Sequence, residues 1–460
     1  MELKLYEDQE WLVSDLRKAM ALNKSVLLQS ATGSGKTAIA IHIIQNVIKK
    51  GKRCGFSVPR KELFNQTCET LDKYGIEHGY IASGKPYSGG MDVYVGMLPT
   101  MASRADELPD LDLVFIDETH FGESYNDKVI KHYKERGTLI VGLSATPWKS
   151  SGKGLGCWYD DMVSGKSIPW LIENKRLSDY KGFAPSNLDL SSLKVTAGDY
   201  NKGDVASFME SQSTITGDAV AHYKKLAMGK LNITFCASIH HSEIVTESFN
   251  ANGVPSAHID GKTPTDEKVR MIRAFAKKEL LNLSCCDLLC FGFDLSQASG
   301  VDVCIESMSD LKPTKSLALQ MQKWGRVLRY KPYPAIILDH ANNFQEHGLP
   351  CSDREWTLTD RIQTKSKSEP VPPTRQCEEC FSVHTPAPTC PDCGYVYKIV
   401  PRKVEEVEGE LEEIQKEVAR KQERSTQGKT DTLEGLIALG KKKGYKNPSF
   451  WAKKVLAGRR

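Results

Sequence analysis

Residues 25–52 constrain the fold of this chain more than any other segment. The apolar run SVLLQS at 25–30 is typical of a buried strand, and the glycine-rich sequence ATGSGKT at 31–37 follows it directly. AIAIHIIQNVIKKGK then continues with helical periodicity over 38–52. A strand, a glycine-rich turn and a helix in this order point backbone N–H groups at an anion at the positive end of the helix. The segment therefore predicts a phosphate-binding loop within an α/β domain.

The residues of this loop have separate predicted roles. Gly33, Ser34 and Gly35 let the backbone close around a phosphate. Lys36 is expected to reach the β- and γ-phosphates of ATP, and Thr37 to place its hydroxyl on Mg²⁺. The strict eight-residue pattern would begin with glycine, which is absent here. The alternative is a coincidental glycine-rich turn, which the flanking strand and helix disfavour.

Apolar runs alternate with helical patterns along most of the chain, and this rhythm predicts parallel α/β sheets. The further strand candidates of a first set are 53–58, 92–97, 111–117 and 137–145, and those of a second set are 232–238, 256–260, 280–285, 301–307 and 333–340. We therefore expect an α/β fold with two tandem parallel-sheet domains, at 1–178 and 179–360. A small four-cysteine module at 374–398 and a charged helix with a basic tail at 399–460 are expected to follow.

Bulk composition excludes some classes of protein. No apolar run approaches the roughly 18 residues that a membrane span requires, and the start MELKLYEDQEW lacks the layout of a secretory signal. Nine of the 13 cysteines are scattered, which is typical of a reducing, cytoplasmic setting. The net charge of +4 is a weak indication of a polyanionic partner.

Two adjacent carboxylates end the strand candidate LDLVFID. Asp117 and Glu118 would lie at the carboxyl end of a buried strand, where open α/β sheets bind ligands. Asp117 suits Mg²⁺ and Glu118 suits the polarisation of an attacking water. The alternative role is an N-cap for the following helix.

These elements resemble those of superfamily 2 helicases of the DEAD/DEAH-box type. ATGSGKT is similar to their motif I, DETH at 117–120 to motif II, SAT at 144–146 to motif III and QKWGRVLR at 322–329 to motif VI. The resemblance implies two RecA-like domains that clamp ATP and move along nucleic acid. It also implies that Gln322, Arg326 and Arg329 act across the interdomain cleft, with Arg329 the first choice for an arginine finger. A surface salt bridge is the alternative role for either arginine.

Weaker matches extend the resemblance. Gln9 lies where relatives read adenine, whereas Arg60, Thr100 and Arg104 lie where they contact nucleic-acid phosphates. Helix capping or a solvated side chain explains each residue equally well when it is taken singly. Motif V departs from the pattern: CFGFD at 290–294 keeps Asp294, assigned to the nucleotide site, but lacks the threonine that couples relatives to their strand.

Segments 153–186, 311–329 and 335–350 narrow the likeness to the RadD-like helicases of bacteria and their phages. That likeness implies DNA rather than RNA as the partner. Two rival functions stay open: a translocase or remodeller that moves on DNA without unwinding it, and a DNA-binding adaptor of repair or recombination in which the ATPase is a switch.

Two CxxC pairs follow the second domain. Cys377, Cys380, Cys390 and Cys393 have the spacing of a tetrahedral Zn²⁺ site with four thiolate ligands. So short a segment cannot bury a core, so the metal is expected to supply its folding energy. Two disulfides are the alternative. The partner of this module is open between protein and nucleic acid.

The end of the chain is basic and aromatic. Lys443 and Trp451 belong to a cluster of lysines, arginines and aromatic residues. In this cluster the lysines would bind phosphates and the aromatic rings would stack on bases. A small helical unit with Trp451 as its core, or a docking site for a protein partner, is the alternative.

Overall fold

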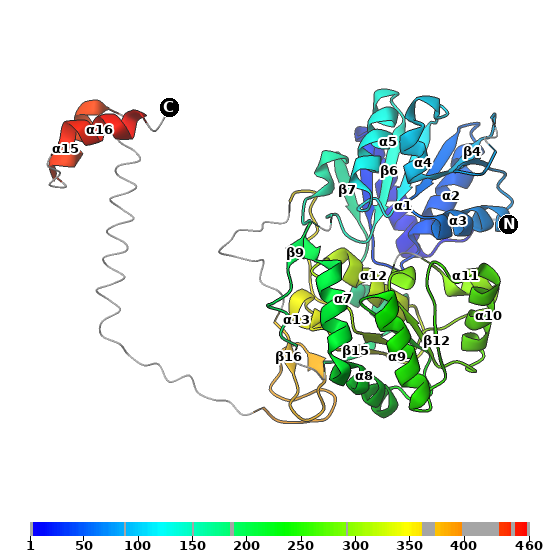
Figure 1. Cartoon of the computed structure of the whole chain (residues 1–460). Coiled ribbons are helices and arrows are strands. Elements are labelled where there is room, and N and C mark those ends of the chain that lie inside the picture. The colour runs from blue at the N-terminus through cyan, green and yellow to red at the C-terminus, as the bar shows by residue number, and fades with distance from the viewer. Residues whose placement is uncertain are drawn as a thin grey trace. The chain divides into compact units, whose positions relative to one another are not determined.

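The computed structural model describes residues 3–86, 89–149, 151–184, 188–290, 293–360, 373–397, 432–442 and 447–457. The chain divides into two compact units, 1–397 and 398–460. The first unit contains both sheets and the four-cysteine module (Figure 1). No helix among the described residues is long and apolar enough to cross a membrane.

The first sheet is parallel throughout and has seven strands in the order β3-β4-β2-β5-β6-β1-β7. They span Ser25–Gln29 (β1), Cys54–Val58 (β2), Gly79–Ile81 (β3), Val93–Met97 (β4), Leu113–Asp117 (β5), Leu139–Ser144 (β6) and Asp161–Ser164 (β7). Helices α1 (Glu7–Leu22), α2 (Lys36–Ile48) and α3 (Lys61–Lys73) share a core with one face, and α4 (Leu98–Ser103) and α5 (Glu123–Glu135) with the other. The strands are short and apolar because both faces are covered.

The second sheet is also parallel and has the order β12-β13-β11-β14-β15-β8. Its strands span Tyr180–Phe183 (β8), Asn232–Phe235 (β11), Ser256–His258 (β12), Asn282–Cys285 (β13), Ser307–Asp310 (β14) and Ala335–Asp339 (β15). Helices α7 (Lys202–Ser211), α8 (Ser213–Leu226) and α9 (Ile239–Ala251) cover one face. Helices α10 (Thr265–Ala276), α11 (Leu295–Ser299) and α12 (Leu317–Val327) pack into the other core.

One predicted strand of the second sheet is misplaced. The apolar run 301–307 suggested a strand, but β14 begins only at Ser307 and reads Ser-Met-Ser-Asp. Its serines belong to a buried polar ladder: Ser307 Oγ donates to Asn232 Oδ1 at 2.9 Å, and Asn232 Nδ2 donates to Ser309 Oγ at 3.2 Å. Neighbouring strands extend this ladder with Thr234 and Asn282, so hydrogen bonds replace the apolar pattern that sequence reasoning requires.

The chain crosses back to the first domain after α13 (Asn343–His347). We call residues 356–360 the strap. Gly156 N–H donates to Leu358 O at 2.9 Å, and Trp148 Nε1 donates to Thr359 O at 3.0 Å. The centroids of the Trp148 and Trp356 rings lie 5.1 Å apart. The strap therefore ties the end of the second domain to the first.

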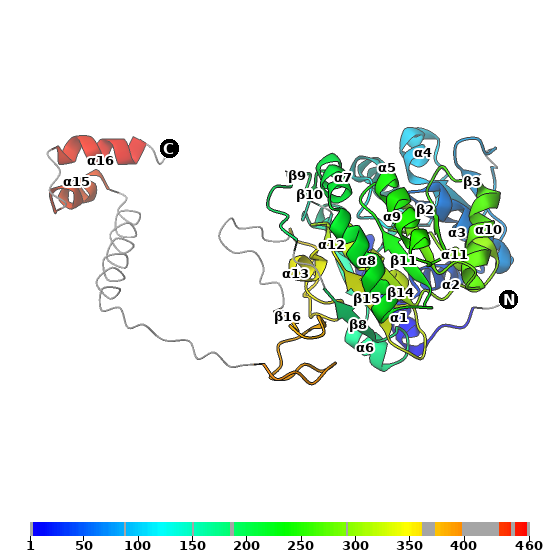
Figure 2. The ribbon, with the colours of Figure 1, turned by 60° about the horizontal axis from the view of Figure 1, so that its bottom comes forward.

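The four-cysteine module (373–397) packs on the edge of the second sheet. It contains β16 (Arg375–Gln376) and β17 (Val383–His384), paired antiparallel. Ala184 N–H donates to Phe381 O at 3.1 Å, and Lys181 Nζ lies 2.7 Å from an Asp392 carboxylate oxygen. The module thus covers the edge strand β8, as Figure 2 shows from below.

Shorter elements complete the chain: α6 (Ile168–Glu173), the hairpin of β9 (Val195–Thr196) and β10 (Asp199–Tyr200), and the 3₁₀ turns Ala105–Glu107, Leu155–Cys157 and Leu288–Cys290. In the second unit, α15 (Leu433–Lys442) packs on α16 (Pro448–Ala457) around Leu436 and Ala452, both fully buried.

Candidate nucleotide site and interdomain cleft

The phosphate loop joins β1 to α2 at the carboxyl edge of the first sheet. Gly33 and Gly35 have φ values of 87° and 90°, a region that favours glycine. A side chain at Gly35 would also collide with Gln9, since its Cβ would lie 2.4 Å from Gln9 Nε2. Both glycines are therefore required by the shape of the loop, and α2 begins directly after them at Lys36.

Lys36 is buried beneath this loop. Its Nζ donates to Ser30 O at 3.0 Å and to Ala31 O at 3.3 Å. Burial lowers the pKa of Lys36, which the carboxylates of Glu118 and Asp117 oppose. The ammonium is thus held beside the loop with those two carboxylates as its nearby counter-charges. Thr37 follows in the first turn of α2.

Gln9 braces the loop from α1. Its Nε2 donates to Ser34 O at 2.9 Å, and its Oε1 accepts from Tyr6 N–H at 3.1 Å. Tyr6 itself is 55% exposed, and the Arg176 guanidinium lies 3.7 Å from its ring centroid. Sequence reasoning missed Tyr6 and Arg176; the signal for Tyr6 was an aromatic residue three positions before Gln9. An adenine contact by Gln9 stays a prediction.

Asp117 and Glu118 lie at the carboxyl end of β5, facing the phosphate loop. Burial and the Glu118 charge raise the pKa of Asp117 to about 7, against the effect of Lys36. Glu118 has a φ of 46°, which is strained for a residue with a side chain. Its Oε2 is buried and has no hydrogen-bond partner among the described residues. Strain and an unpartnered oxygen together are typical of a functional carboxylate.

His120 links this strand end to the segment after β6. Its Nδ1 lies 2.8 Å from Ser144 Oγ, which donates in turn to Thr146 O at 2.6 Å. Ser144 Oγ therefore accepts a hydrogen bond from His120 Nδ1–H, and the other ring nitrogen, Nε2, is an acceptor without a partner among the described residues. Burial lowers the pKa of His120, so the ring is neutral.

Helix α12 of the second domain contacts the phosphate loop directly. A side chain on Gly325 would place its Cβ 2.3 Å from Thr32 Cβ, so the contact has no space for one. Gln322 on the same helix is buried, and neither polar atom of its amide has a partner among the described residues. The cleft thus brings together unpaired buried groups from both domains.

The two arginines of α12 have different environments. Arg326 is buried, its Nη1 donates to Phe293 O at 3.1 Å, and its Nε has no partner in the described part of the chain. Burial and the neighbouring Arg329 lower the pKa of Arg326 to about 10, so it stays charged. Arg329 is more exposed and forms an ion pair with Asp294, with 2.7 Å between Nη1 and Oδ2.

Asp294 also caps helix α11, which carries a contact between the two domains. Its carboxylate caps α11 by accepting from Gln297 N–H at 3.0 Å. Gln297 Nε2 then donates to Gln66 O on α3 of the first domain at 2.6 Å. Asp294 therefore connects Arg329 to the opposite domain, and its assignment to the nucleotide site stays a prediction.

The residues expected on nucleic acid lie at the same edge of the first sheet. Arg60 is the N-cap of α3 after β2, and Thr100 and Arg104 lie in and after α4, which follows β4. Arg60 and Arg104 are exposed and Thr100 is half-buried. Their contact with nucleic acid stays a prediction.

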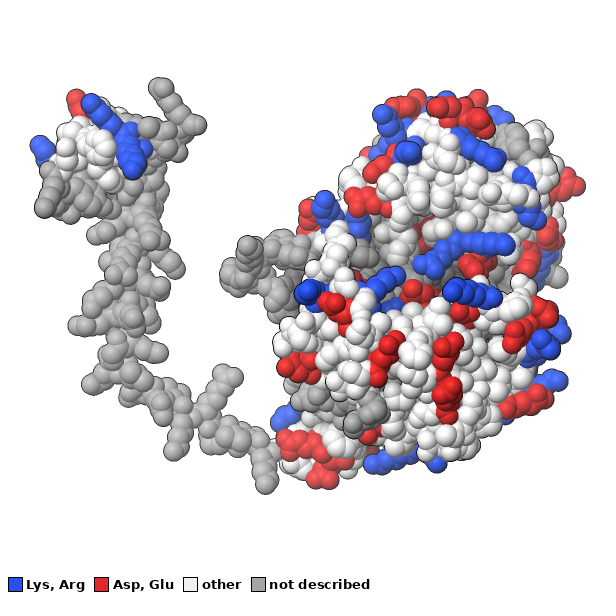
Figure 3. Space-filling model, viewed as in Figure 1, with Lys and Arg blue, Asp and Glu red and all other residues white. Residues whose placement is uncertain are grey.

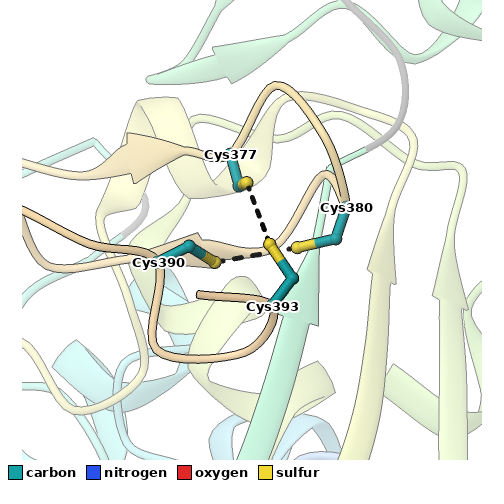
Figure 4. A group of neighbouring side chains, drawn as sticks. All are labelled: Cys377, Cys380, Cys390 and Cys393. Atoms are coloured by element: carbon teal, nitrogen blue, oxygen red, sulfur yellow. Dashed lines mark hydrogen bonds between the residues drawn. The ribbon is translucent and has the colours of Figure 1, made fainter. Parts of the chain in front are cut away.

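The four cysteine Sγ atoms of the module all lie within 4.8 Å of one another (Figure 4). Cys377 Sγ is 3.6 Å from Cys393 Sγ, and Cys380 Sγ is 3.7 Å from Cys390 Sγ. All four are free thiols in this structure. The cluster could hold one metal ion, and four thiolates are the ligand set of structural zinc.

The predicted tail residues are only partly described. Lys443 lies outside the described residues, whereas Trp451 is half-buried in α16. Phe450 next to it is 67% exposed. A nucleic-acid role for the tail stays a prediction.

Comparison with known proteins identifies both domains. Residues 2–149 match the family model "Type III restriction enzyme, res subunit", and residues 218–331 match "Helicase conserved C-terminal domain". Together the two matches cover more than half of the chain.

Relatives match over longer stretches. A 51.5 kDa protein of a Lactococcus phage (isolate 7-9) is 31% identical over 396 residues, which cover 85% of this chain and 82% of the phage protein. The Schizosaccharomyces pombe protein irc3, described as a mitochondrial ATP-dependent helicase, is 27% identical over 375 residues. That match covers 75% of this chain but only 59% of the yeast protein.

Solved structures share the fold at low identity. An HsdR subunit fragment of a type I restriction enzyme from Vibrio vulnificus YJ016 has a TM-score of 0.58 at 15% identity, covering 76% of this chain and 66% of that one. The DNA-bound Type ISP restriction-modification enzyme LlaBIII has a TM-score of 0.53 at 16% identity. That match covers 74% of this chain and 28% of the LlaBIII chain. With two family models and the cleft geometry in agreement, the chain belongs to the superfamily 2 helicases, the ATP-dependent motors that act on nucleic acid.

Proposed function

We propose that this chain is a DNA helicase, related to the RadD-like group, that couples ATP hydrolysis to movement along DNA. The observation that carries the proposal is the contact of α12 with the phosphate loop, where Gly325 lies against Thr32. Through that contact a nucleotide on the loop would lie beside both domains, so that hydrolysis changes how they meet.

In this mechanism Lys36 binds the β- and γ-phosphates, and Glu118 orients the attacking water with its unpartnered Oε2. Arg326 stabilises negative charge on the transferred phosphoryl group, because it is charged, buried and has an uncommitted Nε. Arg329 keeps its predicted role as arginine finger only if it leaves Asp294, its partner in the present structure. The two arginines therefore make distinguishable candidates.

Tyr6 is the residue that we assign to the adenine ring. Its ring is exposed on one side and backed by Arg176 on the other, next to Gln9. A base stacked on Tyr6 would leave the Gln9 amide, already bonded to Ser34, as a brace for the loop.

Two metal sites belong to the proposal. Thr37 and Asp117 fit Mg²⁺, because a hydroxyl and a carboxylate are oxygen ligands at the phosphate loop. Bound Mg²⁺ would neutralise charge on the phosphates. Cys377, Cys380, Cys390 and Cys393 fit Zn²⁺, because their four thiols already converge.

DNA is the proposed substrate on two grounds. The RadD-like resemblance covers segments of both domains, and a fold relative, LlaBIII, has been solved bound to DNA. Arg60, Thr100 and Arg104 would contact its phosphates, and Lys443 and Trp451 would add contacts from the tail. Contacts to phosphates imply little sequence preference and a strong dependence on salt.

A translocase that does not unwind is the second candidate. Cys290 replaces the strand-coupling threonine of motif V and is fully buried, with its thiol near Cys286 O. This position therefore cannot contact a strand as the threonine would.

ATP turnover with single-stranded, duplex and forked DNA and with RNA tests the proposal. We expect turnover to rise most with DNA, and displacement of a labelled strand from forked DNA to accompany it. Stimulation without displacement would favour the translocase. No stimulation by any nucleic acid would contradict the proposal.

A further inference from the structure

An ion pair is buried inside the second domain, on the helix that contacts the phosphate loop. The side chains of Lys323 on α12 and Asp310 at the end of β14 are 0% and 1% exposed. Lys323 Nζ donates to both carboxylate oxygens of Asp310 at 2.7 Å and to Lys312 O at 3.0 Å. Figure 3 shows Lys, Arg, Asp and Glu side chains spread over one face of the molecule, whereas this pair is removed from water.

Asp310 accepts hydrogen bonds from two helices. Gln320 Nε2 on α12 and Asn343 Nδ2 on α13 both donate to its Oδ2 at 3.0 Å. Gln320 and Lys323 are three positions apart, so they lie on the same side of α12. Asp310 therefore holds α12 through two side chains, one of them charged, and joins this helix to α13.

Helix α13 also fixes the loop at 311–316, from which α12 starts. Asn343 Oδ1 accepts from Thr314 N–H at 3.1 Å, and Asn343 Nδ2 donates to Lys312 O at 3.1 Å. His347 Nε2 lies 2.7 Å from Thr314 O. Asn343 and His347 belong to a segment that resembles the RadD-like helicases, and the nucleotide site makes no use of them. Their contacts give this segment a role in placing α12.

Stability alone does not account for the ion pair. Removing two charges from water offsets most of their attraction, so a buried pair is often no more stabilising than apolar residues of the same size. Apolar contacts are non-directional, and the core around Trp324 would by itself tolerate small shifts of α12. A buried polar network with every hydrogen bond made has one arrangement. The pair around Asp310 therefore specifies where the helix lies.

The residues that α12 presents to the first domain follow Lys323 within one helical turn. Gly325 lies against Thr32 of the phosphate loop, and Arg326 is the buried arginine with an unpartnered Nε. We propose that the Lys323–Asp310 pair is a positioning device, which fixes α12 so that Gly325 and Arg326 meet the phosphate loop in the geometry for hydrolysis. The pair acts through the helix and not on the nucleotide. This inference rests on the proposed function, because it assigns a role in ATP hydrolysis.

A charge-neutral double variant of the full chain, Asp310→Asn with Lys323→Met, tests the inference. Asp310→Asn keeps an oxygen that accepts from Gln320 and Asn343, and Lys323→Met keeps much of the side-chain length. The melting temperature should stay within a few degrees of the natural value, because both charges leave together. The KM for ATP should stay within a few-fold, since Lys36 and its loop are unchanged. Nucleic-acid-stimulated kcat should fall at least about 10-fold through misplacement of α12.

Two further variants calibrate this result. Lys323→Met alone leaves the Asp310 carboxylate buried without its cation, so it should lower the melting temperature well below that of the double variant. Lys131→Met with Glu135→Gln removes an exposed ion pair of α5, whose charged atoms lie 3.9 Å apart. This matched control should change neither the melting temperature nor kcat, because exposed pairs contribute little.

Gln320→Met decides the question if the double variant does not fold. It removes one hydrogen bond to Asp310 and leaves both charges paired, so the chain should fold. Stimulated kcat should fall a few-fold at an unchanged KM, because α12 loses one of its two contacts with Asp310.

The outcomes separate this inference from the proposed function. If the natural chain hydrolyses no ATP with any nucleic acid, the proposed function fails and the inference with it. Natural kcat in a folded double variant overturns the inference alone, as does natural kcat in Gln320→Met if the double variant does not fold. A lower melting temperature together with a higher KM would also overturn it, because the pair would then support folding and not position α12.

Discussion

The nucleotide site and the four-cysteine module differ in whether their buried polar side-chain atoms have hydrogen-bond partners. Around the phosphate loop, Glu118, His120, Gln322 and Arg326 each bury at least one polar atom that has no partner among the described residues. Within residues 373–397 every buried side-chain nitrogen or oxygen has a hydrogen-bond partner. His384 Nε2, for example, lies 2.7 Å from the Tyr397 hydroxyl oxygen.

The difference separates a site whose buried nitrogen and oxygen atoms are left for a nucleotide from a module in which the fold itself satisfies them. An unsatisfied buried group costs stability and persists where function uses it. Substitutions in the nucleotide site should therefore reduce turnover and spare stability. Substitutions in the module should reduce stability and spare turnover.

The largest expected effect is on the water-orienting carboxylate. Glu118→Gln should slow ATP hydrolysis at least about 100-fold while ATP binding persists, because the general base is lost and the phosphate contacts are not. The melting temperature should not fall, since the neutral amide removes a buried charge. Glu123→Gln, whose exposed carboxylate pairs with the buried Lys149, is the control and should hydrolyse ATP normally. Near-normal turnover in Glu118→Gln would remove it from the mechanism.

The next largest effect is expected from substitution of Arg326 or Arg329, the two arginines of α12. Arg329→Ala should leave ATP affinity within a few-fold and cut nucleic-acid-stimulated turnover by orders of magnitude if it is the finger. Arg326→Ala should do the same if the buried arginine has that role. Arg270→Ala, on the exposed side of α10, is the matched control. Pre-steady-state ATP binding and steady-state turnover decide between them. Equal losses of affinity and turnover for either arginine would make it a ground-state contact.

The module should show the reverse pattern. Elemental analysis should find one zinc per chain, and Cys390→Ser should release it and lower the melting temperature, because unfolding of the module uncovers the edge strand β8. Basal ATPase of the soluble variant should persist. Cys157→Ser, an exposed thiol of the first domain, should change neither property. Loss of basal ATPase in Cys390→Ser would show that the motor requires the module.

The strap offers the smallest effect. Gly154→Ala would place a Cβ 2.0 Å from Leu358 O, a backbone atom, so the strap must move. We expect a melting temperature lower by a few degrees, in keeping with roughly 1 kcal/mol in a domain of this size. Gly217→Ala, where no atom lies within 4 Å of the added carbon, should not destabilise the chain. An unchanged melting temperature for Gly154→Ala would show that the strap does not contribute to the stability of the chain.

The sequence predicted what local patterns encode. The strands of the first sheet are apolar and followed by glycine or carboxylate signals, so the phosphate loop and the Asp117–Glu118 pair were found. Strand β14 was misplaced because its buried serines pair with Asn232, a partner 75 or more residues away.

Other features also depend on distant contacts. The docking of the module on β8 joins Ala184 to Phe381, and no local pattern indicates that pairing. The same holds for the Arg329–Asp294 ion pair. Motifs identify residues by type and order, whereas partners are determined by the tertiary fold.

The central claim is that hydrolysis requires α12 to lie against the phosphate loop, and Gly325→Ala tests it most directly. The three atoms nearest the added methyl all belong to Thr32 of the first domain, so the helix should still fold while the domains are wedged apart. DNA-stimulated ATP turnover should fall about 100-fold, as small misplacements of catalytic groups can cause. Adding Thr32→Gly to the same chain removes the clash and should restore part of that turnover. Natural turnover in Gly325→Ala alone would contradict the account.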